Sequence, residues 1–229
     1  TSVIAKNEGA RVIYVQEKGK GNALRRAFAE VDADIFVIVD GDNTYDASAV
    51  TGMVKELQEK NLDMVVGVRD GLDNNAYRLG HKSGNWIFNK LFQLFFGNQF
   101  SDIFSGYRVL SRRFVKSFPS HSTGFEIETE LCVHCSNLRL STSEIKTTYI
   151  PRPTGSISKL NTFIDGLKIL MTMLSSLSLN KPMQFYGSLA FLFFLMFLIL
   201  SLPVFYTYFQ LGIVPRLPTL VLSTGFLVL

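Results

Sequence analysis

Residues Ile35–Asp46 read Ile-Phe-Val-Ile-Val-Asp-Gly-Asp-Asn-Thr-Tyr-Asp, an apolar run that stops at two carboxylates one residue apart. The apolar residues Ile35–Val39 predict a β-strand that is buried on both faces of a parallel sheet. Such a strand has no solvent-facing side, so Asp40 and Asp42 are expected at its carboxyl end, where open α/β sheets bind ligands. Gly41 leaves the backbone between them free to bend. The pattern therefore places a candidate binding site directly after this strand.

The two carboxylates are candidate metal ligands. At this distance they repel each other unless a cation lies between them, and paired hard oxygen ligands suit Mg²⁺ or Mn²⁺ held jointly with the phosphates of a substrate. A plainer interpretation stays open, because Asp-Gly is a common turn dipeptide and Asp46 can cap a helix that begins near Ala47. The pair Asp40 and Asp42 thus predicts either a metal-diphosphate site or a simple turn.

The segments around this stretch indicate an α/β fold. Strands and helices are expected to alternate along the chain as follows: a strand at Val12–Gln16, a helix to about Val31, the Asp40 strand, a helix over about Ala47–Lys60 and a buried strand at Met64–Arg69. Alternation of this kind is typical of a parallel sheet with helices on both faces. Arg69 is therefore expected at the same sheet edge as Asp40, with a solvated loop position as the alternative.

A basic, glycine-rich turn precedes the first of these helices. It consists of Lys18, Gly19, Lys20 and Gly21, and the amide groups at a helix N-terminus point outward, toward a phosphate. Further along, Gly106 permits a turn before a strand at Tyr107–Leu110, so that Asp102 and Arg108 are expected to face one pocket.

Several other patterns have structural explanations. Tyr77–Phe96 is expected to be a long aromatic helix that packs on the sheet or on a membrane surface. Glu128 and Glu130 lie at the start of a helix over Glu126–Asn137, where the helix dipole alone favours acids. Cys132 and Cys135, the only cysteines, are expected to be reduced thiols in the core, because no second Cys/His pair completes a zinc site.

The C-terminal part of the chain has the composition of a membrane anchor. Of the 229 residues 47% are hydrophobic and 18% charged, with a net charge of +4, and no charged residue occurs between Lys181 and Arg216. Met183–Tyr208 is long enough for a transmembrane helix, and a second apolar run opens at Leu217 and is cut off at Leu229, so the C-terminus looks truncated. The N-terminus looks truncated as well, because Thr1 is not an initiator Met. Asn161–Leu179 has the period of an amphipathic interfacial helix. Excess cations over Ile145–Lys181 place this side in the cytoplasm.

Taken together, the motifs resemble those of a membrane-anchored family 2 glycosyltransferase of the polyprenyl-phosphate group, similar to dolichol-phosphate mannosyltransferase. The matching segments are Gly19-Lys20-Gly21, Asp40-Gly41-Asp42, Gly67-Val68-Arg69, Asp102–Arg108, Gly124-Phe125-Glu126 and Arg152–Leu160. The family's first strand, with its nucleotide-binding Asn-Asp-Gly-Ser end, is absent, and so is the Gln-x-x-Arg-Trp signature of processive synthases. The second absence argues for a single transfer.

The resemblance implies a GT-A fold, a Rossmann-like and mostly parallel sheet, over residues 1–158, an interfacial helix over 159–181 and a transmembrane region over 182–229. It implies inverting transfer of a sugar from a nucleotide-diphosphate donor to a polyprenyl phosphate at the cytoplasmic face of the bacterial inner membrane, with membrane lipids as further partners and no nucleic acid. Asp40 and Asp42 would hold Mg²⁺ or Mn²⁺, and Asp42, Asp102 and Arg108 would be catalytic. The implied substrate-binding residues are Lys20, Gly21, Arg69, Ser105, Gly106, Glu126, Arg152, Ser158 and Lys159. Another membrane or cell-envelope glycan acceptor, or a nucleotidyltransferase on the same fold, remains the alternative.

Overall fold

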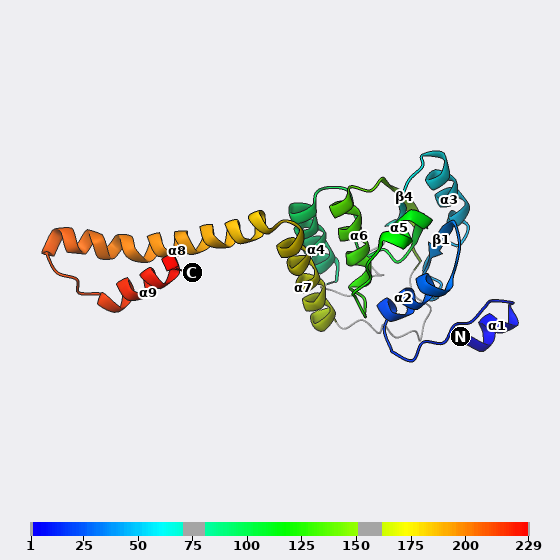
Figure 1. Cartoon of the computed structure of the whole chain (residues 1–229), viewed down its shortest axis with the longest axis horizontal. Helices are drawn as coiled ribbons and strands as arrows, with labels where there is room; N and C mark the ends of the chain where they lie inside the picture. Colours follow the sequence, from blue (N-terminus) through cyan, green and yellow to red (C-terminus); the bar gives the residue numbers. More distant parts are fainter. Residues whose placement is uncertain (1, 71–80, 151–161, 229) are drawn as a thin grey trace. The chain divides into compact units, whose positions relative to one another are not determined.

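The computed structural model describes residues 2–70, 81–150 and 162–228, and it separates the chain into two units, Thr1–Met173 and Leu174–Leu229. In chain order the elements are α1 (Ser2–Asn7), α2 (Lys20–Glu30), β1 (Ile35–Ile38), α3 (Ala49–Glu59), β2 (Met64–Asp70), α4 (His81–Phe96), β3 (Arg108–Ser111), α5 (Arg112–Ser117), α6 (Ile127–Leu138), β4 (Thr142–Thr148), α7 (Thr162–Asn180), α8 (Pro182–Leu211) and α9 (Leu217–Val228). The predicted α/β class is confirmed (Figure 1).

The four strands form one mixed sheet in the order β1-β3-β2-β4. β3 is antiparallel to both β1 and β2, whereas β2 and β4 are parallel. Strands β1, β2 and β4 therefore point in one direction and β3 in the other. As a result, the carboxyl ends of β1 and β2 lie at the same sheet edge as the beginning of β3, and this edge positions the candidate site.

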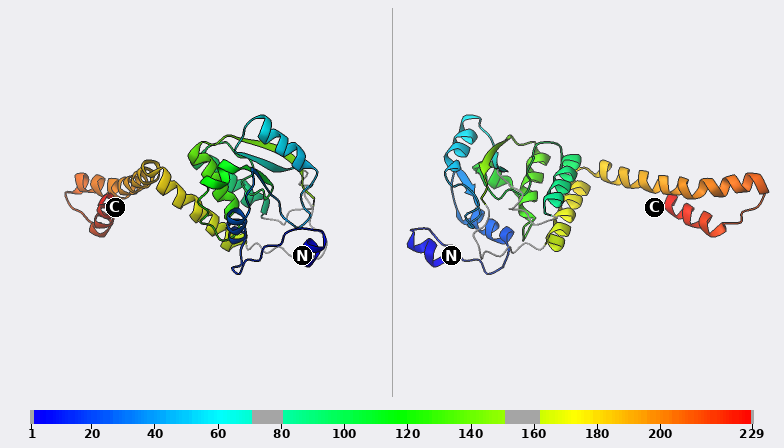
Figure 2. Two further views of the ribbon diagram at one scale, coloured as in Figure 1. Left: turned by 45° about the vertical axis from the view of Figure 1, so that its right-hand side comes forward. Right: turned by 180° about the vertical axis from the view of Figure 1, so that it is seen from behind.

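Helices cover both faces of the sheet. On one face α3 packs against β2, β3 and β4 around a core of Tyr45, Met53, Leu57, Val65, Tyr107 and Val109. Side chains alternate along a strand, so Met64, Val66 and Leu110 face the other side, where α6 lies between the sheet and the neighbouring helices α4 and α7 (Figures 1 and 2). Gly166 of α7 lies beside the ring of Phe88 on α4, where a Cβ atom would meet the ring at an ordinary contact distance of 3.7 Å.

Two strand predictions are wrong. β1 is not buried on both faces, because among the described residues it pairs only with β3 and lies at the edge of the sheet; Val37 and Val39 remain more than two-fifths exposed. They line an apolar groove of about 380 Å³ between β1 and α2. Residues Val12–Gln16 form no strand. The β-branched pattern there lacks a neighbouring strand to bond with, and β propensity alone does not fix a strand. The sheet is also mixed rather than mostly parallel.

α7 is helical over most of the segment for which the sequence predicts an amphipathic helix, and the structure shows which of its faces is buried. Ile169, Met173 and Leu177 are buried, and Asp165 shares their face with only 8% of its surface exposed. The exposed face carries apolar side chains instead, namely Phe163, Ile164, Leu167 and Met171. The reason is that four-residue spacing from Ile169 to Leu177 provides the packing stripe, and Asp165 lies one turn before it. An interfacial location of α7 remains a prediction.

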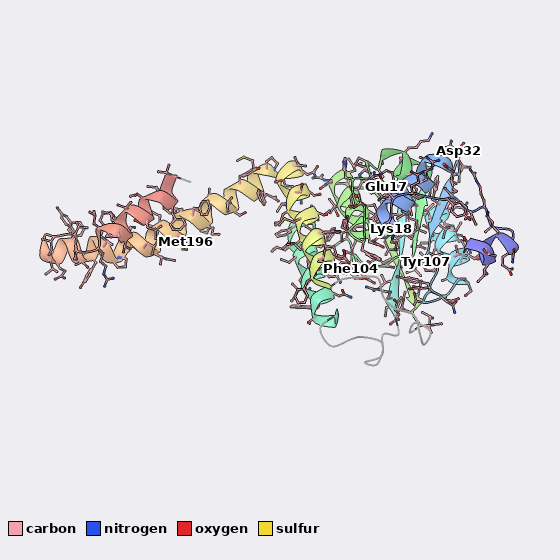
Figure 3. All side chains as sticks on the ribbon, turned by 90° about the horizontal axis from the view of Figure 1, so that it is seen from below. Glu17, Lys18, Asp32, Phe104, Tyr107 and Met196 are labelled. Carbon is pink, nitrogen blue, oxygen red and sulfur yellow. The ribbon has the colours of Figure 1, made fainter. Side chains whose placement is uncertain are left out.

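In the second unit α8 and α9 pack against each other, with Phe193 and Phe226 in ring contact. α8 is one continuous helix of 30 residues that contains Pro203. It is apolar and long enough to cross a membrane. At 1.5 Å per residue such a helix is about 45 Å long, compared with a hydrocarbon core of about 30 Å. Figure 3 labels one residue of each unit: Met196 is exposed on the apolar helix α8, whereas Tyr107 is buried in the core of the first unit.

Candidate active site

Three segments converge at the sheet edge described above. Asp40 and Asp42 follow β1, Arg69 lies near the end of β2, and residues 102–107 lead into β3. The reversed direction of β3 explains why this last segment reaches the same edge. Arg69 lies within β2 rather than in a solvated loop, and its bonds to Asp102 join it to the segment before β3.

Asp40 is held by Lys20, the first residue of α2. The Lys20 ammonium nitrogen lies 2.5 Å from Asp40 Oδ1 and also forms an ion pair with Glu128, in the first turn of α6. Burial by itself would lower the pKa of Lys20, but the two carboxylates outweigh it and raise that pKa above its ordinary value. Burial also raises the pKa of Glu128. Lys20 is therefore a fixed cation between two acids.

The backbone at Ser105 and Gly106 closes around the Asp40 carboxylate. A Cβ atom at position 106 would lie 2.3 Å from Asp40 Oδ2 and 3.0 Å from the Lys20 ammonium, so no larger residue fits without moving them. The Ser105 hydroxyl donates to the Gly67 carbonyl at 2.5 Å, and the Gly106 amide donates to the Tyr45 hydroxyl at 2.8 Å. These bonds fix the turn that faces Asp40.

Replacing Tyr45 by phenylalanine is expected to loosen this turn. The change leaves the buried Gly106 amide without its acceptor, which costs about 1–3 kcal/mol of unfolding free energy. Thermal unfolding of Tyr45→Phe, followed by circular dichroism, should show a midpoint several degrees below that of the unmodified chain. Tyr14→Phe is the matched control, because Tyr14 is 69% exposed. Equal midpoints for the two variants would contradict the assigned role of the Tyr45 hydroxyl.

Arg69 and Asp102 form a two-pronged ion pair. Arg69 Nε and one terminal nitrogen donate to the two Asp102 oxygens at 2.7 and 2.8 Å, and both side chains are close to fully buried. Asp102 also accepts a bond from the Phe104 amide, and the guanidinium lies 5.6 Å from the ring centre of Tyr149. A planar, always charged guanidinium held this firmly is suited to binding a phosphate or carboxylate at the sheet edge.

Arg108 does not share a pocket with Asp102, contrary to the prediction. Its side chain is fully buried and donates to the carbonyl groups of Ile103 and Ser105 and to the Cys132 sulfur. The reason is strand alternation, which turns Arg108 toward α6 rather than toward the open edge. Arg108 thus fixes the backbone of the 102–107 segment through hydrogen bonds from the buried side of the sheet. Cys132 and Cys135 are buried free thiols, as predicted, and burial raises the pKa of both.

The start of α2 is covered by the segment before α6. The Asn22 amide donates to the Thr123 carbonyl, and a Cβ at Gly21 would lie 2.2 Å from the Ser122 carbonyl oxygen. A Cβ at Gly19, where φ is +130°, would lie 2.1 Å from the Thr123 carbonyl oxygen. The glycines of this basic turn therefore serve the contact with residues 122–123. Lys20 is the member of the turn that reaches the site.

Glu126 binds backbone rather than reaching the sheet edge. Its Oε1 accepts bonds from the amides of Thr123 and Gly124 at 3.0 and 2.9 Å. Burial would raise the pKa of Glu126, but these amide bonds outweigh it and lower the pKa. A substrate contact of Glu126 stays a prediction. Arg152, Ser158 and Lys159 lie outside the residues that the structure describes.

Asp40 and Asp42 can hold a divalent metal ion only in combination with a ligand. Among residues 2–70, 81–150 and 162–228 no group of three potential His, Cys, Asp or Glu ligands is gathered. Mg²⁺ keeps several waters and is commonly bound by one or two carboxylates plus substrate phosphates, which fits a two-carboxylate donor set beside Lys20 and Arg69. Asp42 Oδ1 accepts a 2.6 Å bond from the Thr44 hydroxyl, which orients it.

Sequence reasoning missed two residues that build the site. Tyr45 looked like part of a turn, and Glu128 looked like an ordinary acid at a helix N-terminus. Nothing in their local patterns distinguishes them, because their partners Gly106 and Lys20 are far away in the chain.

Comparison with known proteins gives a consistent family. The sequence profile described as Glycosyl transferase family 2 matches residues 1–118. Glycosyltransferase AglJ of Haloferax volcanii is 36% identical over 194 residues, covering 83% of this chain and 63% of AglJ. The low-salt glycan biosynthesis hexosyltransferase Agl6 of the same organism is 32% identical over 177 residues, covering 76% of this chain and 42% of Agl6. This chain therefore spans less than two thirds of either relative.

Among solved structures, glucosyl-3-phosphoglycerate synthase from Mycobacterium tuberculosis, in complex with Mn²⁺ and UDP-glucose, superposes with a TM-score of 0.61. The two sequences are 21% identical, and the match covers 77% of this chain and 63% of the other. At this identity the likeness shows a shared fold.

Proposed function

This chain belongs to glycosyl transferase family 2, and from that we propose that it transfers a sugar from a nucleotide-diphosphate donor to a polyprenyl phosphate at a membrane surface. The fold is of the GT-A type. The observation that carries the proposal is the single sheet edge at which Asp40, Lys20 and the Arg69–Asp102 pair are gathered.

The donor diphosphate is proposed to bind with Asp40 and Asp42 on one side and the cations Lys20 and Arg69 on the other. A bound Mg²⁺ or Mn²⁺ would neutralise the charge that develops on the leaving diphosphate. In the structure Lys20 pairs with Asp40, and the Thr44 hydroxyl orients Asp42. Support from a structural neighbour is limited to the donor: glucosyl-3-phosphoglycerate synthase was solved with Mn²⁺ and UDP-glucose.

The acceptor requires little help from a base. A phosphate monoester has a second pKa of about 6 and is already ionised at neutral pH. Arg69, fixed by Asp102, can then orient an acceptor phosphate for attack on the anomeric carbon with inversion. In this proposal Asp102 is a positioning residue and not the group that removes a proton.

Apolar surface supports a lipid acceptor. α8 can cross a membrane by length and composition, and in the first unit α4 and α7 expose large apolar side chains. These are Trp86, Ile87 and Leu94 on α4 and Phe163, Ile164, Leu167 and Met171 on α7. A membrane-embedded chain meets a lipid-linked phosphate at headgroup depth. These surfaces support a lipid acceptor over a soluble one.

The test is transfer itself. Membranes containing the full chain are incubated with each of several radiolabelled nucleotide sugars and a polyprenyl phosphate, and the label is followed into the lipid extract. Label in a single mild-acid-labile lipid, dependent on added polyprenyl phosphate, is expected. Label that enters a glycan or a soluble phosphorylated acceptor instead would contradict the acceptor. In a separate incubation with a nucleoside triphosphate and a sugar 1-phosphate, formation of a nucleotide sugar with release of pyrophosphate would indicate a nucleotidyltransferase.

The topology gives a separate prediction. If α8 spans the membrane and the catalytic unit is cytoplasmic, the segment between α8 and α9 lies on the far side. In intact cells, Val214→Cys is expected to react with a membrane-impermeant maleimide. Glu59→Cys, at an exposed position at the end of α3, should react only after permeabilisation. The natural cysteines add little background because both are buried. The reverse labelling pattern would disprove the proposed orientation.

A further inference from the structure

Glu128 has a role that its position in the sequence does not reveal. It lies in the first turn of α6, where an exposed acid would satisfy the helix dipole equally well, yet only 6% of its surface is exposed. Glu130, in the same turn, instead accepts bonds from the amides of His121 and Ser122. Burying a carboxylate is unfavourable unless a cation compensates it, and here Lys20 supplies that cation.

The Lys20 ammonium is shared between two carboxylates with different surroundings. Asp40 lies at the open sheet edge with about a third of its side chain exposed, whereas the Glu128 side chain is 8% exposed. Fully buried Arg108 adds a second favourable charge on the inner side of Glu128. Glu128 is therefore the permanent partner of Lys20, and Asp40 is the partner that can exchange its contact for another cation.

We propose that Glu128 is a positioning residue that keeps hold of the Lys20 ammonium while Asp40 turns from Lys20 to a divalent metal ion, and that it thereby sets the metal affinity of the site. This rests on the proposed metal role of Asp40. Without Glu128, the described partners of Lys20 would leave Asp40 as its one carboxylate, and a metal ion would have to break that ion pair. With Glu128 present, the buried ammonium stays neutralised and in place when the metal arrives.

The proposal predicts that a residue that is not a metal ligand controls metal binding through Lys20. Mn²⁺ binding to the full chain in detergent is measured from the loss of the free-ion EPR signal, in parallel series with UDP and with GDP because the base is unknown. Glu128→Gln is expected to raise the Mn²⁺ dissociation constant roughly tenfold, as for other groups behind metal ligands. The control Glu130→Gln removes the same charge from the same helix turn and should change the Mn²⁺ dissociation constant less than about twofold, because the described bonds of Glu130 go to the amides of His121 and Ser122 and not to Lys20 or Asp40.

A double variant separates this mechanism from simple attraction between an anion and a metal. In a Lys20→Gln background Asp40 is already free, so adding Glu128→Gln should leave the Mn²⁺ dissociation constant unchanged. General electrostatic attraction would instead lower affinity equally in both backgrounds, which would overturn the proposal. Circular dichroism checks the fold. If Glu128→Gln does not fold, Glu128→Asp, which draws the carboxylate back from Lys20, is compared in both backgrounds with the same criteria.

The failure of this inference is distinguishable from the failure of the proposed function. If the unmodified chain and the Glu128→Gln variant bind Mn²⁺ with equal affinity, the proposed role of Glu128 is overturned and the transferase proposal stands. An unmodified chain that binds no Mn²⁺ with either nucleotide overturns both.

Discussion

The variant Asp42→Asn is expected to lose sugar transfer by at least about a thousandfold, since the metal and its ligands supply several kcal/mol of transition-state stabilisation and each 1.36 kcal/mol is a factor of ten. Asparagine keeps the size of the side chain and can still accept the Thr44 hydroxyl bond, but it removes the charge. The fold should survive, because Asp42 lies after the end of β1 and outside the core. Initial rates with labelled donor measure the loss.

Asp46→Asn is the matched control for this change. Asp46 lies in the same loop, and its bonds to the Ser48 amide and hydroxyl lower its pKa; its described hydrogen bonds go to Ser48 and not to Lys20, Arg69 or Asp102. It should retain transfer within a few-fold. Excess chelator should abolish transfer by the unmodified chain, and added Mg²⁺ or Mn²⁺ should restore it. Full activity of Asp42→Asn, or full activity in chelator, would disprove the metal assignment.

The fold was largely predictable because local patterns identify its elements. The apolar run at Met64–Val68 gave a buried strand, and the helices around residues 20–30 and 49–59 were placed to within a few residues. What failed were statements about neighbours. Burial of β1 depends on whether a second strand lies beside it. The strand expected at Val12–Gln16 likewise needs a neighbouring strand to pair with. Pairing is a long-range property that a run of apolar residues does not encode.

The site was predictable where charged residues follow a strand or a turn in the sequence, and unpredictable where a residue acts through a partner that is distant in the chain. Lys20, Asp40, Arg69 and Asp102 were singled out, and the structure joins them in two ion pairs. Their catalytic and binding roles remain predictions. Arg108 was given the wrong surroundings because its register on β3 decides which way it points. Glu128 was passed over because a helix N-terminus offers an equally good explanation for any acid.

The second large effect is expected at the Arg69–Asp102 pair. Asp102→Asn should reduce kcat/KM about a hundredfold or more, because a misplacement of about 1 Å in a group that orients the substrate can cost about a hundredfold in rate. Much of that cost comes from an Arg69 guanidinium that is no longer held in the geometry two bonds impose. Arg69→Lys should be nearly as damaging, since an ammonium group cannot reproduce the two-pronged contact. Steady-state rates against donor and acceptor concentration measure both.

The combination of the two variants distinguishes a positioning carboxylate from a general base. If Asp102 acts by holding Arg69, the double variant Arg69→Lys/Asp102→Asn should be about as slow as either single variant, because each change already destroys the same unit. If Asp102 removes a proton from the acceptor, its loss should multiply with the loss of Arg69, and the residual rate of Asp102→Asn should rise steeply with pH. An acceptor phosphate that is already ionised has no proton to give. Non-additive losses with an unchanged pH profile are therefore the expected result, and multiplicative losses with a new pH dependence would return Asp102 to the role of base and exclude the polyprenyl phosphate mechanism proposed for this edge of the sheet.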